Sequence, residues 1–160
     1  MKVYHGGTEI IKLPSVSEGR VGLDFGQDFY VTDRQQQAES WADRMARIRM
    51  GKGIVNIYEF DLLVAKTEYQ YKQFSEYDVE WLNFIISNRR NEYNGTKYDI
   101  VEGGVANDRV IDTVEAYMSN LMPLETALQN LSLHRPNNQL CILSQQVLDK
   151  YLRFVESYNI

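Results

Sequence analysis

The sequence predicts an α+β fold with a mostly antiparallel or split β-sheet and flanking helices. Segments typical of strands are scattered among segments with helical spacing, without a strict β-α-β rhythm. The chain has 160 residues and shows no repeat, low-complexity tract or linker, so we expect one domain over residues 1–160. Apolar residues make up 44% of the chain and aromatic residues 12%, which argues against disorder.

Segments that are apolar, aromatic or alternating predict the strands. A Gly-Gly pair follows the first of them, and another pair, Gly103-Gly104, is expected to break a later one. The long loop after the first strand is punctuated by Pro14, Gly19 and Gly22. The expected strands are residues 2–5, 28–32, 53–62, 67–74, 98–106 and 139–144.

Apolar residues at helical spacing predict the helices. Thr32 or Asp33 is expected to cap the first helix, and Ser75 or Asp78 the second. Pro123 is expected to interrupt the third. The expected helices are residues 34–50, 75–90, 112–133 and 144–158.

Charge and composition exclude several classes of protein. The net charge is −5, and the densest basic stretch, residues 43–53, reads as the outer face of a helix. Proteins that bind duplex DNA are usually more basic, although a small anionic ligand or a short single strand remains possible. We see no signal peptide and no apolar run of about 20 residues, so we expect a soluble cytoplasmic protein without membrane contact.

The chain also lacks the residues of several well-known sites. Its one cysteine, Cys141, rules out an internal disulfide framework, and its apolar neighbours predict a buried core thiol. The two histidines, His5 and His134, form no HExxH pair, and we expect no metal. There is no Walker loop, no GxSxG elbow and no GxGxxG that opens a helix.

Two segments near the N-terminus hold candidate binding residues. In VYHGG, His5 is either a hydrogen-bonded structural residue or a group that bonds a ligand hydroxyl, with glycines that let the ligand approach. In DFGQDFYVT, Phe29 and Tyr30 should point to opposite faces, one into the core and the other into a cleft. Trp41 follows Tyr30 by 11 positions, so a flat heterocycle could stack between the two rings.

Three further residues are candidates with open alternatives. Glu102 and Asp108, in the segment YDIVEGGVAND, are either carboxylates of a site or solvated and structural residues. Gln139 opens the last expected strand after the turn HRPNN. It is either an ordinary edge residue or a neutral amide aimed into the cleft.

The order of these segments resembles the ADP-ribosyltransferase superfamily. VYHGG, then DFGQDFYVTDRQQQAESWA, then a strand that opens on Gln139 is similar to the His-Tyr-Glu branch shared by diphtheria-type toxins and poly-ADP-ribose polymerases. The chain also looks like a little-studied bacterial family assigned to that superfamily, with an HGG…DFGxGFYxT…Q pattern over nearly its whole length. The resemblance implies a split β-sheet that clamps NAD+, the substrate, in a cleft.

The resemblance also assigns roles to residues. His5 would hydrogen-bond the adenosine-side ribose, and Gly6 would contact the nicotinamide carboxamide through its backbone. Tyr30 would stack on the nicotinamide with Trp41 as the facing aromatic. Thr32, at the end of the same strand, is placed among the residues that bind NAD+.

The chain departs from the pattern at the acid. Gln139 occupies the position of the catalytic acid, where it can bond the 2′-hydroxyl of the nicotinamide ribose but carries no charge. Glu102 or Asp108 would be a displaced carboxylate that compensates. Asn137, two residues before Gln139, would help to choose the target. Asp28 stands where the bacterial pattern usually has glycine.

We therefore expect an NAD+-dependent mono-ADP-ribosyltransferase that modifies a macromolecular acceptor, either protein or nucleic acid. By the resemblance, such small domains often serve as toxins of toxin–antitoxin or phage-defence systems, which implies an antitoxin protein as partner. Three alternatives stay open. The first is a catalytically weakened module that binds NAD+ or ADP-ribose, the second is an NAD+ glycohydrolase, and the third is a purely structural interaction domain.

Overall fold

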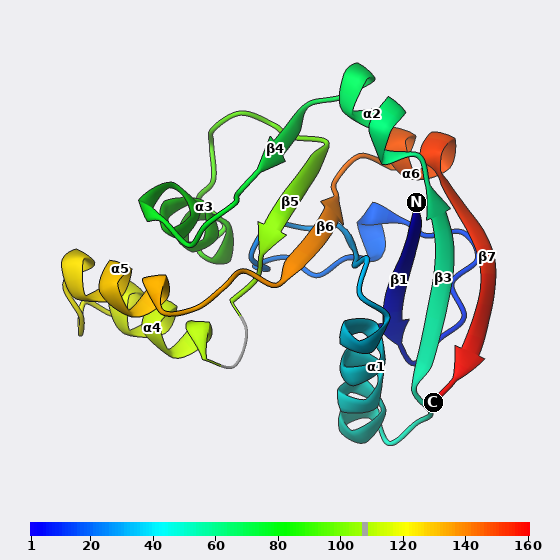
Figure 1. Ribbon diagram of the computed structural model, residues 1–160, viewed down its shortest axis with the longest axis horizontal. Coiled ribbons are helices and arrows are strands. Elements are labelled where there is room, and N and C mark those ends of the chain that lie inside the picture. The colour runs from blue at the N-terminus through cyan, green and yellow to red at the C-terminus, as the bar shows by residue number, and fades with distance from the viewer. Residues whose placement is uncertain (107–108) are drawn as a thin grey trace.

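The computed structural model, which describes residues 1–106 and 109–160, has two β-sheets flanked by helices (Figure 1). A three-stranded antiparallel sheet has the order β1-β3-β7, with β3 in the centre. A four-stranded sheet has the order β2-β6-β5-β4, in which only β4 and β5 are parallel. The strands are β1 (Lys2–Gly7), β2 (Phe29–Val31), β3 (Ile54–Phe60), β4 (Tyr71–Gln73), β5 (Ile100–Gly104), β6 (Asn138–Ile142) and β7 (Leu152–Asn159).

The helices complete an α+β fold, as the sequence predicts. Helix α1 packs along β1, while α4 and α5 lie side by side at the end of the molecule farthest from β7 (Figure 1). No helix in the described part of the chain is long and apolar enough to cross a membrane. The helices are α1 (Gln35–Arg49), α2 (Leu62–Glu68), α3 (Val79–Arg89), α4 (Val110–Met118), α5 (Leu124–Ser132) and α6 (Gln145–Tyr151), with a 3-10 turn, η1 (Val16–Glu18).

The prediction of one helix over residues 144–158 is wrong. Helix α6 ends at Tyr151, and the residues that follow form β7, which pairs with β3 over its whole length. The backbone pairing with β3 stabilises β7. The ring of Phe154 also makes an edge-to-face contact with Tyr58, with 5.8 Å between the ring centroids. Tertiary pairing therefore overrides the apolar spacing that favours a helix. The sequence prediction also missed the short helix α2.

The predicted helix boundaries are confirmed in part. Asp78 caps α3 and accepts a hydrogen bond from the Trp81 amide at 2.8 Å, and Pro123 directly precedes α5. The cap of α1 is Arg34 rather than Thr32 or Asp33, although the Thr32 hydroxyl accepts the Arg34 N–H at 3.1 Å.

Two apolar clusters lie on the two faces of the four-stranded sheet. One contains Phe25, Trp81 and Cys141, and we call this side the Trp81 face. The other contains Phe29 and Ile100, and we call this side the Ile100 face. The prediction that Cys141 is a buried core thiol is confirmed.

The expected break at Gly103-Gly104 is confirmed, because β5 ends at Gly104, and the glycines admit aromatic rings there. The Trp81 indole N–H donates to the Gly104 carbonyl at 2.7 Å, and a Cβ on Gly104 would lie 2.5 Å from the Tyr77 ring. The pair therefore makes room for aromatic rings on the Trp81 face at the end of β5.

Candidate functional site

Backbone hydrogen bonds join the two sheets at one described pair of residues, although buried side chains such as Phe29 and Tyr58 also pack between the sheets. Tyr4 of β1 and Thr32, just after β2, exchange two backbone hydrogen bonds of 2.8 and 2.9 Å. In an antiparallel ladder the next such pair lies two residues further along each strand. That pair would be Gly6 with Tyr30, and the structure does not form it. Beyond Tyr4 and Thr32 the described residues of the two strands therefore form no further backbone pair.

The His5 side chain links β1 to β2 at the point where the backbone pairing stops. Its Nδ1 is 2.7 Å from the Tyr30 carbonyl oxygen, and its ring stacks on Phe29 with centroids 4.5 Å apart. A carbonyl can only accept, so Nδ1 carries the proton and Nε2 is left as an acceptor. Burial lowers the pKa of His5 and the Tyr30 carbonyl partly opposes this, so the imidazole is neutral at pH 7.

Gly6 packs against α1, and in the described part of the chain its backbone N–H and C=O groups are unpaired. A Cβ at this position would lie 2.0 Å from the backbone oxygen of Ala38, so α1 crosses β1 in direct contact with its backbone. Tyr4 directs its backbone groups away from β3, and Gly6, two residues later, does the same. Among the described residues these groups of Gly6 have no hydrogen-bond partner.

Tyr30 and Gln139 share one face of the sheet. Tyr30 is paired with Cys141 across the β2–β6 ladder, and Gln139, two residues before Cys141, points to the same side. The prediction that Phe29 and Tyr30 face opposite ways is confirmed. Tyr30 remains partly exposed. The Trp81 face thus carries both the stacking candidate and the amide candidate.

The second ring of the predicted clamp, Trp41, lies on the surface of α1. Its side chain is 49% exposed, and the Arg44 guanidinium lies 5.6 Å from the indole centroid. The Tyr30 ring instead lies parallel to Phe25, 6.2 Å between centroids, and its hydroxyl accepts the Phe25 N–H at 3.1 Å. The two clamp rings do not touch in the described structure, so a sandwich of Tyr30 and Trp41 around a ligand stays a prediction.

The remaining predicted contacts have structural partners. The buried Thr32 hydroxyl lies 3.2 Å from Gln37 Oε1 and 3.3 Å from the Asn138 carbonyl, which fixes Thr32 at the junction of the sheets. Asn137 Oδ1 accepts from the Tyr77 hydroxyl at 3.1 Å and from the Val105 amide at 3.2 Å. Both side chains hold the frame of the site, and any direct contact with a ligand stays a prediction.

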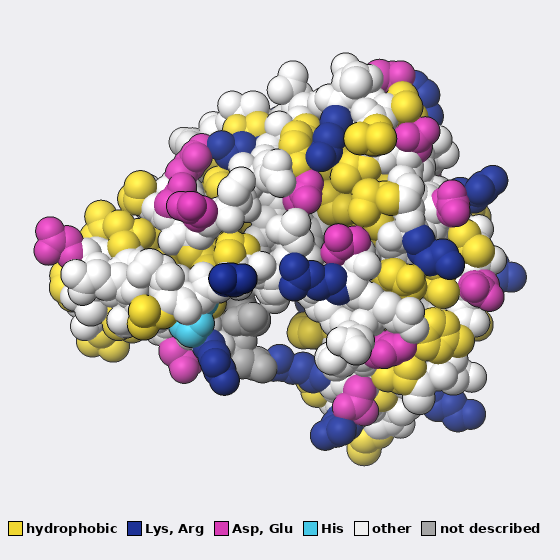
Figure 2. Space-filling view, in the orientation of Figure 1, with side chains coloured by type: hydrophobic (Ala, Val, Ile, Leu, Met, Phe, Trp, Pro, Cys, Tyr) yellow, Lys and Arg dark blue, Asp and Glu magenta, His cyan; other side chains and the backbone are white. Residues whose placement is uncertain are grey.

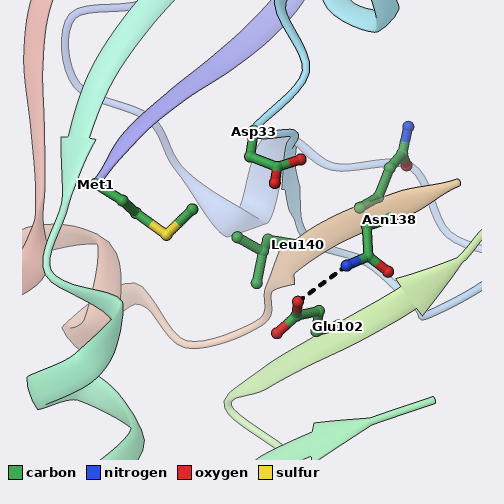
Figure 3. Close-up of a pocket in the computed structure, with 6 residues that line it drawn as sticks. Met1, Asp33, Glu102, Asn138 and Leu140 are labelled. Carbon is green, nitrogen blue, oxygen red and sulfur yellow. Dashed lines mark hydrogen bonds between the residues drawn. The ribbon is translucent and has the colours of Figure 1, made fainter. Parts of the chain in front are cut away.

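Glu102 does not join Tyr30 and Gln139. It lies opposite Leu140 in the β5–β6 ladder and therefore points to the Ile100 face. Its Oε1 accepts from Asn138 Nδ2 at 3.2 Å, as Figure 3 shows. The geometry thus speaks against Glu102 as a displaced catalytic acid. The other candidate, Asp108, lies outside the described residues.

Two further contacts hold the Glu102 side chain on the Ile100 face of the sheet. Its Oε2 accepts a hydrogen bond from the Tyr71 hydroxyl and lies 3.5 Å from Lys66 Nζ. Glu102 and Asn138 border a small pocket with room for about one water molecule (Figure 3). The other residues that line it are Met1, Asp33, Gln139 and Leu140.

The sequence interpretation missed a buried polar cluster beside Tyr30. Asp24 Oδ1 pairs with Arg89 Nε at 2.6 Å, and Asp24 Oδ2 accepts the Ala106 amide at 2.7 Å. Asp28, 4% exposed, contacts the Cys141 thiol. The sequence feature that could have indicated this cluster is the presence of two aspartates in the segment DFGQD.

The surface near the site is hollowed between α1 and the α4–α5 pair (Figure 2). Lys and Arg side chains stand on the rim of this hollow in Figure 2. Three arginines close in sequence to α1, α4 and β6 are exposed: Arg34 precedes α1, Arg109 precedes α4 and Arg135 precedes β6. This rim suits an anionic ligand although the chain as a whole is acidic.

Comparison with known proteins gives one match. The model of a family described as a protein of unknown function, DUF3990, matches residues 1–154. Searches of curated proteins and of solved structures found no match. Because the family model covers nearly the whole sequence, the chain belongs to the DUF3990 family.

Proposed function

We propose that the protein binds NAD+ and transfers its ADP-ribose to a macromolecular acceptor. The observation that carries the proposal is the missing Gly6–Tyr30 pair at the point where the sheets part. A free N–H and a free C=O on one residue can bind a primary carboxamide as they would bind a neighbouring strand. The nicotinamide end of NAD+ carries such a group on a flat ring.

The surrounding side chains suit the rest of that ligand. The partly exposed Tyr30 ring offers an aromatic face, and neutral His5 offers Nε2 as an acceptor for a ribose hydroxyl. Gln139 can bond the 2′-hydroxyl of the nicotinamide ribose. Much of the rate gain would come from holding the leaving group and the ribose in place.

The reaction balances without a further reagent. The bond between the ribose C1′ and the nicotinamide nitrogen breaks, and its electron pair stays with nicotinamide, which leaves as a neutral molecule. The ribose carbon becomes oxocarbenium-like. A nucleophilic atom of the acceptor then bonds to C1′ and loses its proton.

The absence of a carboxylate at Gln139, the position of the catalytic acid, favours a second function, the binding of NAD+ or ADP-ribose. Gln139 is neutral, and Glu102 points to the opposite face of the sheet. A protein with this arrangement would bind NAD+ or ADP-ribose and turn it over slowly. NAD+ glycohydrolase activity, in which water is the acceptor, is the third outcome that the following experiment separates.

The experiment is incubation with NAD+ labelled in its adenylate part, together with separate pools of protein, RNA and DNA. Transfer of the label to one pool, with equal release of nicotinamide, supports the transferase and identifies the acceptor class. Nicotinamide release without labelled macromolecules indicates a glycohydrolase. Binding without release indicates the binding module, and absence of binding rejects all three.

Replacing Tyr30 by Ala should weaken NAD+ binding by about 5- to 150-fold, because stacking on an aromatic ring is worth about 1–3 kcal/mol. Isothermal titration calorimetry measures the loss. Tyr30→Phe keeps the ring but loses the bond to the Phe25 N–H that helps to orient it, so it should lose less affinity for NAD+ than Tyr30→Ala does. Equal binding by the Ala variant would rule out the stacking role.

A further inference from the structure

The proposed chemistry leaves one buried carboxyl group beside Tyr30 without a use. Asp28 is 4% exposed, and its Oδ1 has no hydrogen-bond partner among the described residues. Its Oδ2 contacts Sγ of Cys141, the residue paired with Tyr30. A charged carboxylate with one bare oxygen in such a place is strongly disfavoured. The geometry therefore suits the neutral acid.

The charged and titratable groups around Asp28 point the same way. Asp24 belongs to the same loop and is itself paired with Arg89 of α3, while Tyr30 and Cys141 face Asp28 from β2 and β6. Burial first, and then the charge of Asp24, raise the pKa of Asp28 to about 9, against the opposing effect of the Tyr30 hydroxyl.

The backbone around Asp28 has little freedom to move. A Cβ on Gly19 would lie 2.4 Å from the Asp28 carbonyl oxygen, so the preceding loop presses directly on this residue. Gly26 adopts a φ of 115°, which closes the turn between Phe25 and Asp28. The Phe25 N–H at the start of that turn bonds the Tyr30 hydroxyl. Asp28 is thus linked to the Tyr30 ring through a short, tightly packed turn.

We propose that Asp28 is a positioning residue which, as a neutral acid, holds the turn of residues 24–28 and thereby the orientation of the Tyr30 ring. This inference rests on the proposed function only for the identity of the ligand. When Asp28 loses its proton, two carboxylates oppose each other in the same buried turn. The turn then moves, and the Tyr30 hydroxyl loses its bond to the Phe25 N–H.

The stability of the folded protein should also depend on whether Asp28 carries its proton. The pKa of Asp28 is raised from an unfolded value of about 3.9, so its stabilising effect is complete below about pH 4 and is lost as the pH rises through about 9. The melting temperature of the natural protein should therefore fall over this range more than that of Asp28→Asn. Parallel curves for the two proteins would show that Asp28 is charged in the folded state and would overturn the proposal.

The first direct test needs no NAD+. Protein with ¹³C-labelled tyrosine rings is titrated by NMR from pH 7 to 10, and Tyr30→Phe identifies the Tyr30 signal. Burial, and next the charge of Asp28, hold the pKa of Tyr30 well above its ordinary value, so Tyr30 itself does not ionise in this range. The Tyr30 signal should move near pH 9 in the natural protein and stay fixed in Asp28→Asn. A signal that behaves alike in both proteins would overturn the proposal.

The second test separates this inference from the proposed function. Asp28→Asn should keep the KM for NAD+ within about twofold and make it independent of pH, while folded Asp28→Ala should raise it at least about tenfold. Turnover of NAD+ with an unchanged KM in Asp28→Ala would overturn the positioning role. An NMR shift in a protein that binds no NAD+ would leave the positioning role intact and reject the proposed function. If Asp28→Ala does not fold, the pH dependence of KM in Asp28→Asn decides.

Discussion

Replacing Gln139 by Glu is expected to raise the rate of nicotinamide release by about 10²- to 10³-fold. The ribose gains positive charge as nicotinamide leaves, and one preorganised group that stabilises charge developing in a transition state is typically worth about 2.7–4 kcal/mol. Gln139 already lies on the face of the sheet that carries Tyr30, so the new carboxylate takes a position that the strand fixes. Initial rates of nicotinamide release at saturating NAD+ measure the effect.

Two variants serve as controls for this gain. Gln139→Ala should release nicotinamide more slowly than the natural protein, because it loses the bond to the 2′-hydroxyl. Glu102→Gln keeps an acceptor for Asn138 on the opposite face and should leave the rate within a few-fold of the natural value. The assignment of the acid position fails if Gln139→Glu changes nothing while Glu102→Gln abolishes release.

Replacing Gly6 by Ala should destabilise the protein by about 1–3 kcal/mol or more. The added Cβ would lie 2.0 Å from the Ala38 oxygen, and a backbone carbonyl inside a helix cannot turn away as a side chain would. Helix α1 must therefore shift off β1. Urea unfolding monitored by circular dichroism measures the loss of free energy.

Gly51→Ala is the matched control for this variant. Gly51 follows Met50, the C-cap of α1, and nothing lies within 4 Å of the Cβ that it would gain. Its stability should change by no more than about 0.5 kcal/mol. Equal stability of the Gly6 and Gly51 variants would mean that α1 does not approach β1 as closely as the structure shows.

The local elements of this fold were largely predictable, because the sequence of each segment agrees with its structure. Apolar spacing predicts α1 and α3, and alternation predicts β3. The C-terminal strand was not predictable, since its pairing with β3 lies more than 90 positions away in sequence. Local spacing around Val155 fits a helix equally well.

For the candidate site, the sequence predicted which face of a strand a residue occupies better than it predicted the surroundings of that residue. Period-two alternation along a strand was enough to separate Phe29 from Tyr30. The relation of Glu102 to Gln139 depends on the register between two strands from distant parts of the chain, which no local pattern specifies. The environment of Asp28 depends on α3 and β6 at once, so its burial could not be inferred from DFGQD alone.

The Tyr4–Thr32 junction also has a consequence for how the molecule fluctuates. Each sheet closes its own hydrogen-bonded ladder, and one residue pair joins the two ladders. Cooperative units of local unfolding follow such boundaries. The free energy of opening the Tyr4–Thr32 junction should therefore be lower than the free energy of unfolding either sheet. The amide of Thr32 should therefore exchange with deuterium sooner than that of Ile57 in the centre of β3. Local opening would then occur at the Tyr4–Thr32 junction, next to the residues that are proposed to bind the ligand.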